Sequence, residues 1–146
     1  MIETSLWSLQ QAIVKRLSED IALNEVVNGV YDEVPTERNE AGELIPVKFP
    51  YVTVGEPTTT PFETKTSFGE DVAIVLDCWS QYKGKKEVYD ILNLMLKAIA
   101  KSPLELEGDF SLNEVKLHQM TVIRDIDNIT RHGIMRWKFN INNGKG

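Results

Sequence analysis

The side chains that most often carry out catalysis or bind metals are not spaced in patterns typical of either. The two histidines, His118 and His132, lie on separate predicted strands and lack the spacing of a zinc-protease motif. Cys78 is the only cysteine, which excludes an intrachain disulfide and a cluster of cysteine ligands around zinc. Asp125 and Asp127 resemble the opening of a calcium loop, but the third oxygen ligand and the following glycine are missing. The sequence therefore predicts no catalytic residues, no cofactor and no metal.

Asp77 is the carboxylate that most invites a functional explanation, because it is the one charge within an otherwise apolar run. A buried carboxylate needs a partner or a raised pKa. Three explanations are open for Asp77: it is a catalytic acid, it pairs with a Lys or Arg on the adjacent strand, or it faces a subunit boundary. Ion pairs account for many such carboxylates, and nearby Trp79 is of a type that usually anchors a core or an interface. We predict a structural role for both, with a subunit interface among the alternatives.

Composition describes a single domain, residues 1–146. Hydrophobic residues at 42% and charged residues at 26% are typical of a globular protein. With 16 basic and 22 acidic residues, the net charge of −6 argues against a protein that holds nucleic acid. The start of the chain shows no secretory pattern, and no apolar stretch is long enough to cross a membrane. We expect the chain to stay in the cytoplasm or in an assembly built there.

Hydrophobic periodicity predicts an α+β fold: a mostly antiparallel sheet of about five strands, with two to three helices packed on one face. The predicted helices are Thr4–Asp20, a short one carrying Leu23, Val26 and Val27, and Lys85–Lys101. The predicted strands are Val30–Val34, Tyr51–Glu56, Asp71–Trp79, Val115–Asp125 and Arg131–Ile141. Asp71–Trp79 is apolar on both faces, so we expect helices to cover one face and a neighbouring subunit the other.

Two connections are long for a compact domain, and we predict disordered loops at 36–48 and 57–70 and a frayed tail at 142–146. Ordering backbone costs about 1–2 kcal/mol per residue. In 57–70 only Phe62 and Phe68 are large apolar side chains, each recovering about 1.5–3 kcal/mol when buried. Backbone pairing aside, the second loop should therefore be mobile alone and become ordered against a partner. The alternative is a hairpin tip without a role.

An ordered set of short motifs resembles a known family. A helix is followed by Leu23 and Val27, then Val30-Tyr31-Asp32 and Pro35, Phe49-Pro50-Tyr51-Val52 and Gly55, Trp79-Ser80, Gly84, and a helix with Glu87, Ile91 and Leu92. This order resembles the tail-completion proteins of long-tailed bacteriophages, also called tail-to-head joining or tail-terminator proteins. The resemblance extends from about Leu6 to Leu96.

The resemblance implies a structural virion protein without catalytic residues. Such proteins form a ring, commonly a hexamer, that caps the tail tube and docks to the connector or stopper of the head. The implied partners are copies of the chain, the connector or stopper protein and the tail-tube protein. The implied location is the head–tail interface of a virion assembled in the bacterial host's cytoplasm. The family's long loops meet neighbouring rings, and here they correspond to Thr58, Thr59, Thr60, Phe62 and Phe68.

DNA would pass through such a ring without being specifically bound, since six copies at −6 each carry −36. Two other hypotheses stay open. One is an adaptor of a related contractile or prophage-derived machine. The other is a small α+β ligand-binding or enzyme domain that uses Asp77 with a neighbouring carboxylate.

Overall fold

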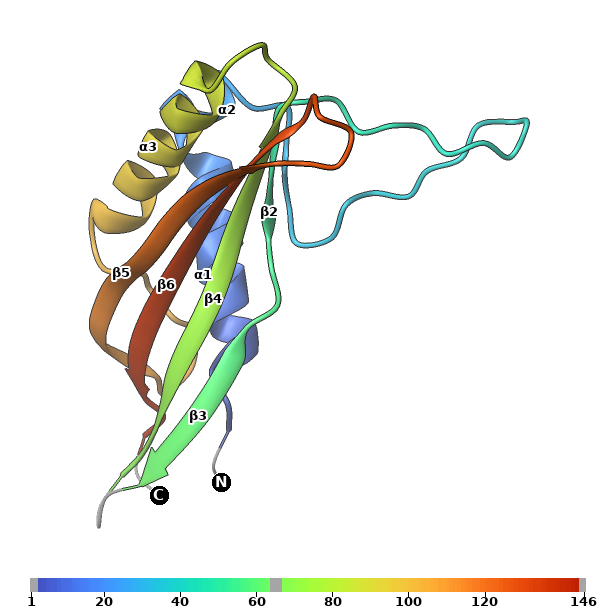
Figure 1. The fold of residues 1–146 in the computed structure, drawn as a ribbon. Coiled ribbons are helices and arrows are strands. Elements are labelled where there is room, and N and C mark those ends of the chain that lie inside the picture. The colour runs from blue at the N-terminus through green and yellow to red at the C-terminus, as the bar shows by residue number, and fades with distance from the viewer. Residues whose placement is uncertain (1–2, 64–66, 145–146) are drawn as a thin grey trace.

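The computed structural model describes residues 3–63 and 67–144, which fold into a sheet with helices on one side (Figure 1). The helices are α1 (Leu6–Glu19), α2 (Ile21–Asn24) and α3 (Lys86–Ala100). The strands are β1 (Val30–Tyr31), β2 (Tyr51–Val54), β3 (Thr58–Glu63), β4 (Phe68–Ser80), β5 (Ser111–Arg124) and β6 (Arg131–Asn142). The predicted α+β class and the antiparallel character of the sheet are confirmed.

The sheet has the strand order β1-β2-β4-β6-β5, and β3 pairs with the first half of β4 beyond the end of β2. All these pairs are antiparallel except β1–β2, which is parallel. The long central strand β4 therefore contacts β6 along its whole length on one side and β2 and β3 in turn on the other. This arrangement makes β4 the element that holds the two halves of the sheet together.

The core lies between this sheet and the helices α1 and α3. Successive side chains of a strand point to opposite faces, and on β4 and β6 every second residue is buried beneath the helices. The largest fully buried side chains come from both layers: Leu9, Ile13 and Leu17 of α1, Ile91 and Met95 of α3, Ile74 and Leu76 of β4, and Met135, Phe139 and Ile141 of β6. The apolar stripes predicted for the two long helices are thus the surfaces that pack on the sheet.

The main difference from the sequence prediction is strand β3. We expected residues 57–70 to lack regular structure, but Thr58–Glu63 pairs with Phe68–Ala73 as a hairpin; residues 64–66 lie outside the described part. Backbone hydrogen bonds order this segment without large side chains. The comparison of ordering cost with side-chain burial in the sequence analysis does not include these hydrogen bonds. The tail differs too, because Asn142 belongs to β6 and Asn143 is buried. Residues 145–146 lie outside the described range.

Cys78 is fully buried on the helix-covered face of β4, and burial raises the pKa of its thiol to about 12. Thiolate is the reactive form of cysteine. We therefore expect no reaction of native Cys78 with a disulfide reagent at pH 8, and full reaction once the protein is unfolded in denaturant. The absorbance of the thiol that the reagent releases measures the extent of reaction in the native and in the unfolded protein. Rapid labelling of the native protein would contradict the buried position.

Candidate assembly surface

Within residues 3–63 and 67–144, no layer covers the face of the sheet opposite the helices (Figure 1). On β4 this face carries Ala73, Val75, Asp77 and Trp79, all partly exposed. It is therefore a mixed surface of small apolar, aromatic and charged groups. The prediction that helices cover only one face of this strand is confirmed; that a neighbouring subunit covers the other stays a prediction. The face is called the open face below.

One end of the open face carries a row of neighbouring rings from three strands and from Phe49, two residues before β2. The rings of Trp79 and His132 stack with centroids 3.7 Å apart and 12° between their planes. The ring of Tyr51 lies on the other side of Trp79, with the two ring centroids 6.2 Å apart. The ring of Phe49 comes next, with its centroid 5.1 Å from that of Tyr51. Burial, with smaller contributions from Asp125 and Tyr31, raises the pKa of Tyr51. The row forms a largely apolar surface, in which the hydroxyl of Tyr51 stays protonated.

Asp77 lies beside this row and bonds to His132, its Oδ1 atom 2.6 Å from the ring Nε2. Both side chains are mostly buried, with 16% and 17% of their surface exposed, respectively. The predicted partner on an adjacent strand is thus present, but it is a histidine rather than Lys or Arg. Sequence reasoning placed His132 on a strand as a surface or sheet-face residue but considered only Lys or Arg as the partner of Asp77. In an antiparallel pair, the diagonal position on β6 could have suggested it.

The open face holds a hollow of about 490 Å³ that lies over β4, β6 and β5 and is bordered by Thr58 and Thr60 of β3. Its basic side chains are Lys116, Arg136 and Lys138, and the carboxylates Asp71 and Glu114 also line it. Lys116 pairs with Glu114 at 3.4 Å, and Asp71 accepts a hydrogen bond from Asn140. In the described part of the chain no carboxylate lies within 4 Å of the charged nitrogens of Arg136 or Lys138, which leaves two cations available to a partner.

The five residues predicted as an assembly loop belong to the β3–β4 hairpin: Thr58, Thr59, Thr60 and Phe62 on β3, and Phe68 at the start of β4. Thr58 and Thr60 are exposed, whereas Phe62 is half-buried. The Phe62 ring lies over Gly69, where an added Cβ would be 2.3 Å from the ring, so a larger residue does not fit. The structure groups these residues at one end of the sheet, and their role in assembly stays a prediction.

Thr59 points the other way, into a buried cluster around Glu70. Only 2% of Glu70 is exposed, yet its carboxylate accepts hydrogen bonds from Thr4, Ser5, Thr59 and Asn143. Burial alone would raise the pKa of Glu70, but these hydrogen bonds outweigh it and lower the pKa to about 2. The cluster ties the hairpin to the start of α1 and to the end of β6. The sequence analysis did not single out Glu70.

The second long connection, residues 32–48, is called the arm below. It extends away from the body beyond the β1–β2 edge of the sheet (Figure 1). Residues 32–46 are exposed throughout, and the arm's strand-like contact is an isolated bridge between Arg38 and Leu44. Asn28 fixes its base by donating to the carbonyls of Phe49 and Pro50. The predicted disorder of 36–48 is untested.

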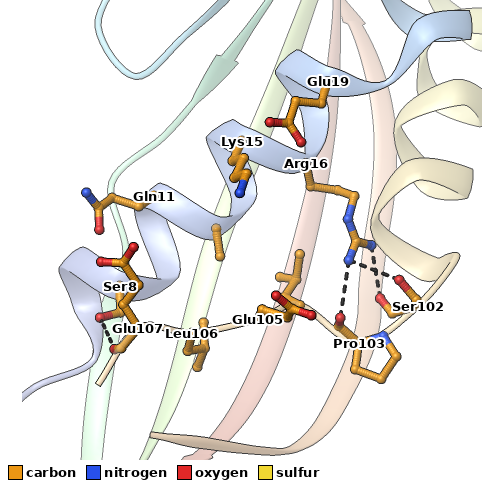
Figure 2. Close-up of a pocket in the computed structure, with 12 residues that line it drawn as sticks. Ser8, Gln11, Lys15, Arg16, Glu19, Ser102, Pro103, Glu105, Leu106 and Glu107 are labelled. Atoms are coloured by element: carbon orange, nitrogen blue, oxygen red, sulfur yellow. Dashed lines mark hydrogen bonds between the residues drawn. The ribbon is translucent and has the colours of Figure 1, made fainter. Parts of the chain in front are cut away.

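A groove on the other side of the molecule lies between α1 and residues 102–107 (Figure 2). Arg16 of α1 crosses it and donates to the carbonyls of Ala98, Ser102 and Pro103 at 2.9–3.2 Å. Carbonyls at a helix end have no partner within the helix, so Arg16 completes the end of α3. We therefore assign this groove to the packing of the helices.

No three His, Cys, Asp or Glu side chains of the described residues come together as a metal site requires. Nor does a described helix have the length and apolar character that crossing a membrane needs. Comparison with known proteins supplies what the geometry alone does not. A family model described as Tail completion protein gp17 matches residues 11–141. The chain belongs to this family.

A curated relative, the tail completion protein gp17 of Bacillus phage SPP1, is 38% identical over 136 residues, which cover 93% of each chain. The solved structure of the bacteriophage SPP1 gp17 protein is 37% identical, covers 96% of this chain and 93% of that one, and superposes with a TM-score of 0.58. A chain in the solved virion of a native gene transfer agent particle gives a TM-score of 0.83 at 19% identity, covering 95% and 98%. This last likeness shows the fold.

The resemblance seen in the sequence is thus confirmed: the chain is a bacteriophage tail completion protein and a structural component of the virion. Its relatives are structural proteins rather than enzymes. The enzyme hypothesis also required a second carboxylate beside Asp77, and the hydrogen-bond partner that the structure supplies is His132. We therefore interpret Asp77 and Trp79 as parts of the open face.

Proposed function

We propose that the protein forms a closed ring that caps the finished tail tube and joins it to the connector or stopper of the head. The family supports the place of action, and the uncovered open face supports the ring. A subunit of this size that leaves a sheet face with Val75, Trp79 and a row of rings partly exposed has an apolar surface suited to another protein. In a closed ring that face is covered by the next copy.

In this proposal, the contacts between copies and the contacts along the tail axis use adjacent parts of the molecule, which meet where Thr58 and Thr60 border the hollow. The open face serves contacts between copies. The β3–β4 hairpin, with exposed Thr58 and Thr60 at one end of the sheet, serves the neighbouring ring of tube or connector. DNA passes through the ring without specific contacts, as the net charge of −6 per copy favours.

Val75→Glu tests this function, because it places a charge in the middle of the open face. The new carboxylate lies opposite Arg136 of β6, so it neutralises one of the two cations that the open face offers to a partner and adds a charged group to the contact. Taking charged groups out of water at an interface costs several kcal/mol, and each 1.4 kcal/mol is about tenfold in association. In virus carrying V75E, we expect about a hundredfold fewer infectious particles, and electron micrographs showing heads and tails unjoined. Ala100→Glu, on the exposed side of α3, is the matched control and should leave both counts unchanged.

Thermal unfolding of the purified variants checks that each is folded. Normal joining by V75E would show that the open face is not an interface. Complete virions that lack the protein altogether would overturn the joining function itself.

A further inference from the structure

The arm projects from the subunit with a defined shape, and its tip does not lie against the body of the same subunit. Three backbone hydrogen bonds close the tip: Asn39 donates to the Glu43 carbonyl at 2.9 Å, Gly42 to the Asn39 carbonyl at 3.0 Å and Ile45 to the Glu37 carbonyl at 2.8 Å. The Arg38 guanidinium donates to the carbonyl of Gly42 at 2.7 Å. These hydrogen bonds give the exposed tip a defined shape that it can present to a partner.

The chemistry of the arm is both acidic and apolar. Residues 32–48 contain five carboxylates and two basic side chains, a net of −3. Arg38 already donates a hydrogen bond within the tip, so the charges that the tip offers to a partner are the carboxylates of Glu37, Glu40 and Glu43. Val34, Leu44 and Ile45 are 40%, 58% and 45% exposed. A binding surface for this arm should therefore supply cations next to a patch of aliphatic side chains.

The hollow supplies the cations, and the open face next to it supplies the aliphatic side chains. Arg136 and Lys138 project from β6 and pair with no described carboxylate, and Ala73, Val75 and Ile134 lie beside them, partly exposed. Charges of opposite sign on the two surfaces favour correct docking and register. The arm and the hollow are different surfaces of one subunit, which is what a head-to-tail contact in a ring requires.

We propose that the arm of one copy lies in the hollow on the open face of the next copy, with the arm's carboxylates on Arg136 and Lys138. This inference rests on the proposed ring. The arm leaves from the β1–β2 edge and points away from the sheet (Figure 1), whereas the hollow lies over β4, β6 and β5. Eight extended residues reach about 26 Å, enough to cross the boundary between two subunits.

A cysteine pair tests the contact in assembled particles. One variant carries Glu40→Cys at the arm tip and a second carries Lys138→Cys in the hollow; buried Cys78 does not interfere. Virions assembled from an equal mixture of the two variants are oxidised and analysed by denaturing gel. We expect a covalent dimer of one copy of each. The matched control pairs Glu40→Cys with Ala100→Cys on α3 and should give no dimer.

Charge reversal gives a second, independent readout. Glu40→Lys with Glu43→Lys, or Arg136→Glu with Lys138→Glu, should each lower the yield of joined particles about tenfold, and combining both sets in one chain should restore most of it. Normal virions without the cross-link would overturn the arm contact and leave the proposed function standing. Loss of DNA retention by the Arg136/Lys138 variant, without a cross-link, would instead identify the hollow as a DNA-facing surface and also overturn the contact. Failure of the wild-type protein to enter virions would overturn the function.

Discussion

Replacing Glu70 with Gln should destabilise the folded protein by about 3 kcal/mol at pH 7. The buried carboxylate accepts hydrogen bonds from Ser5, Thr59 and Asn143, and the amide of Gln would point donor groups at these donors. The pKa of Glu70 falls from 4.5 to about 2 on folding, and each unit is worth about 1.4 kcal/mol. Thermal unfolding should show a midpoint lower by roughly 6–12 °C for a chain of this size.

The same residue makes part of the stability pH-dependent. Because folding lowers the pKa of Glu70, its contribution is complete above pH 4.5 and is lost as the pH falls towards 2. The difference in melting temperature between wild type and E70Q should therefore shrink over that interval. Glu63→Gln, at an exposed position of the same hairpin, is the matched control and should differ from wild type by less than about 0.5 kcal/mol. A constant difference between E70Q and wild type from pH 7 to pH 3 would contradict the ionised state of Glu70.

Local patterns predicted most of the fold. The apolar stripe of α3 and the alternation of Met135, Trp137 and Phe139 on β6 are strong periodic signals, and both elements lie where the sequence indicates. The weak signals failed. Thr58–Glu63 carries a proline and three threonines, and its pairing with β4 depends on a partner that local reasoning does not weigh. Only the hairpin geometry brings Thr59 to Glu70.

The open face was predictable in kind but not in detail. A strand apolar on both sides indicates two covers, and Asp77 and Trp79 were already suspected of lying at a boundary. The stacking of Trp79 on His132 and the bond from His132 to Asp77 need the register of β4 against β6, in which Trp79 lies opposite His132. Register is a tertiary property, set here by the full length of the sheet. The arm shows the same limit, because the contact that we propose for its acidic, exposed side chains depends on cations that the sheet brings together far from it in the sequence.

Gly133 of β6 is the position where the core should tolerate an added methyl group least. An added Cβ would lie 2.6 Å from the Cys78 sulfur, 3.0 Å from Val88 and 3.2 Å from Leu92. Those side chains are buried where α3 packs on the centre of the sheet. We expect Gly133→Ala to lower the free energy of unfolding by about 2–3 kcal/mol, as overpacking of a dense core does. Urea denaturation of the variant and of the wild-type protein measures this difference in the free energy of unfolding.

Cys78→Ala supplies the matching test, because it removes the sulfur that the new methyl group meets first. Alone, it should cost about 1–2 kcal/mol through the lost contacts. In the double variant the added methyl group occupies space that the sulfur has vacated, so the two costs should fall short of their sum by at least 1 kcal/mol. Strict additivity would mean that the Gly133 site relaxes some other way, through the flexible ends of Val88 and Leu92. If the double variant instead loses less stability than the sum of the two single variants, the contact between β4 and β6 under α3 is closely packed around Gly133 and Cys78.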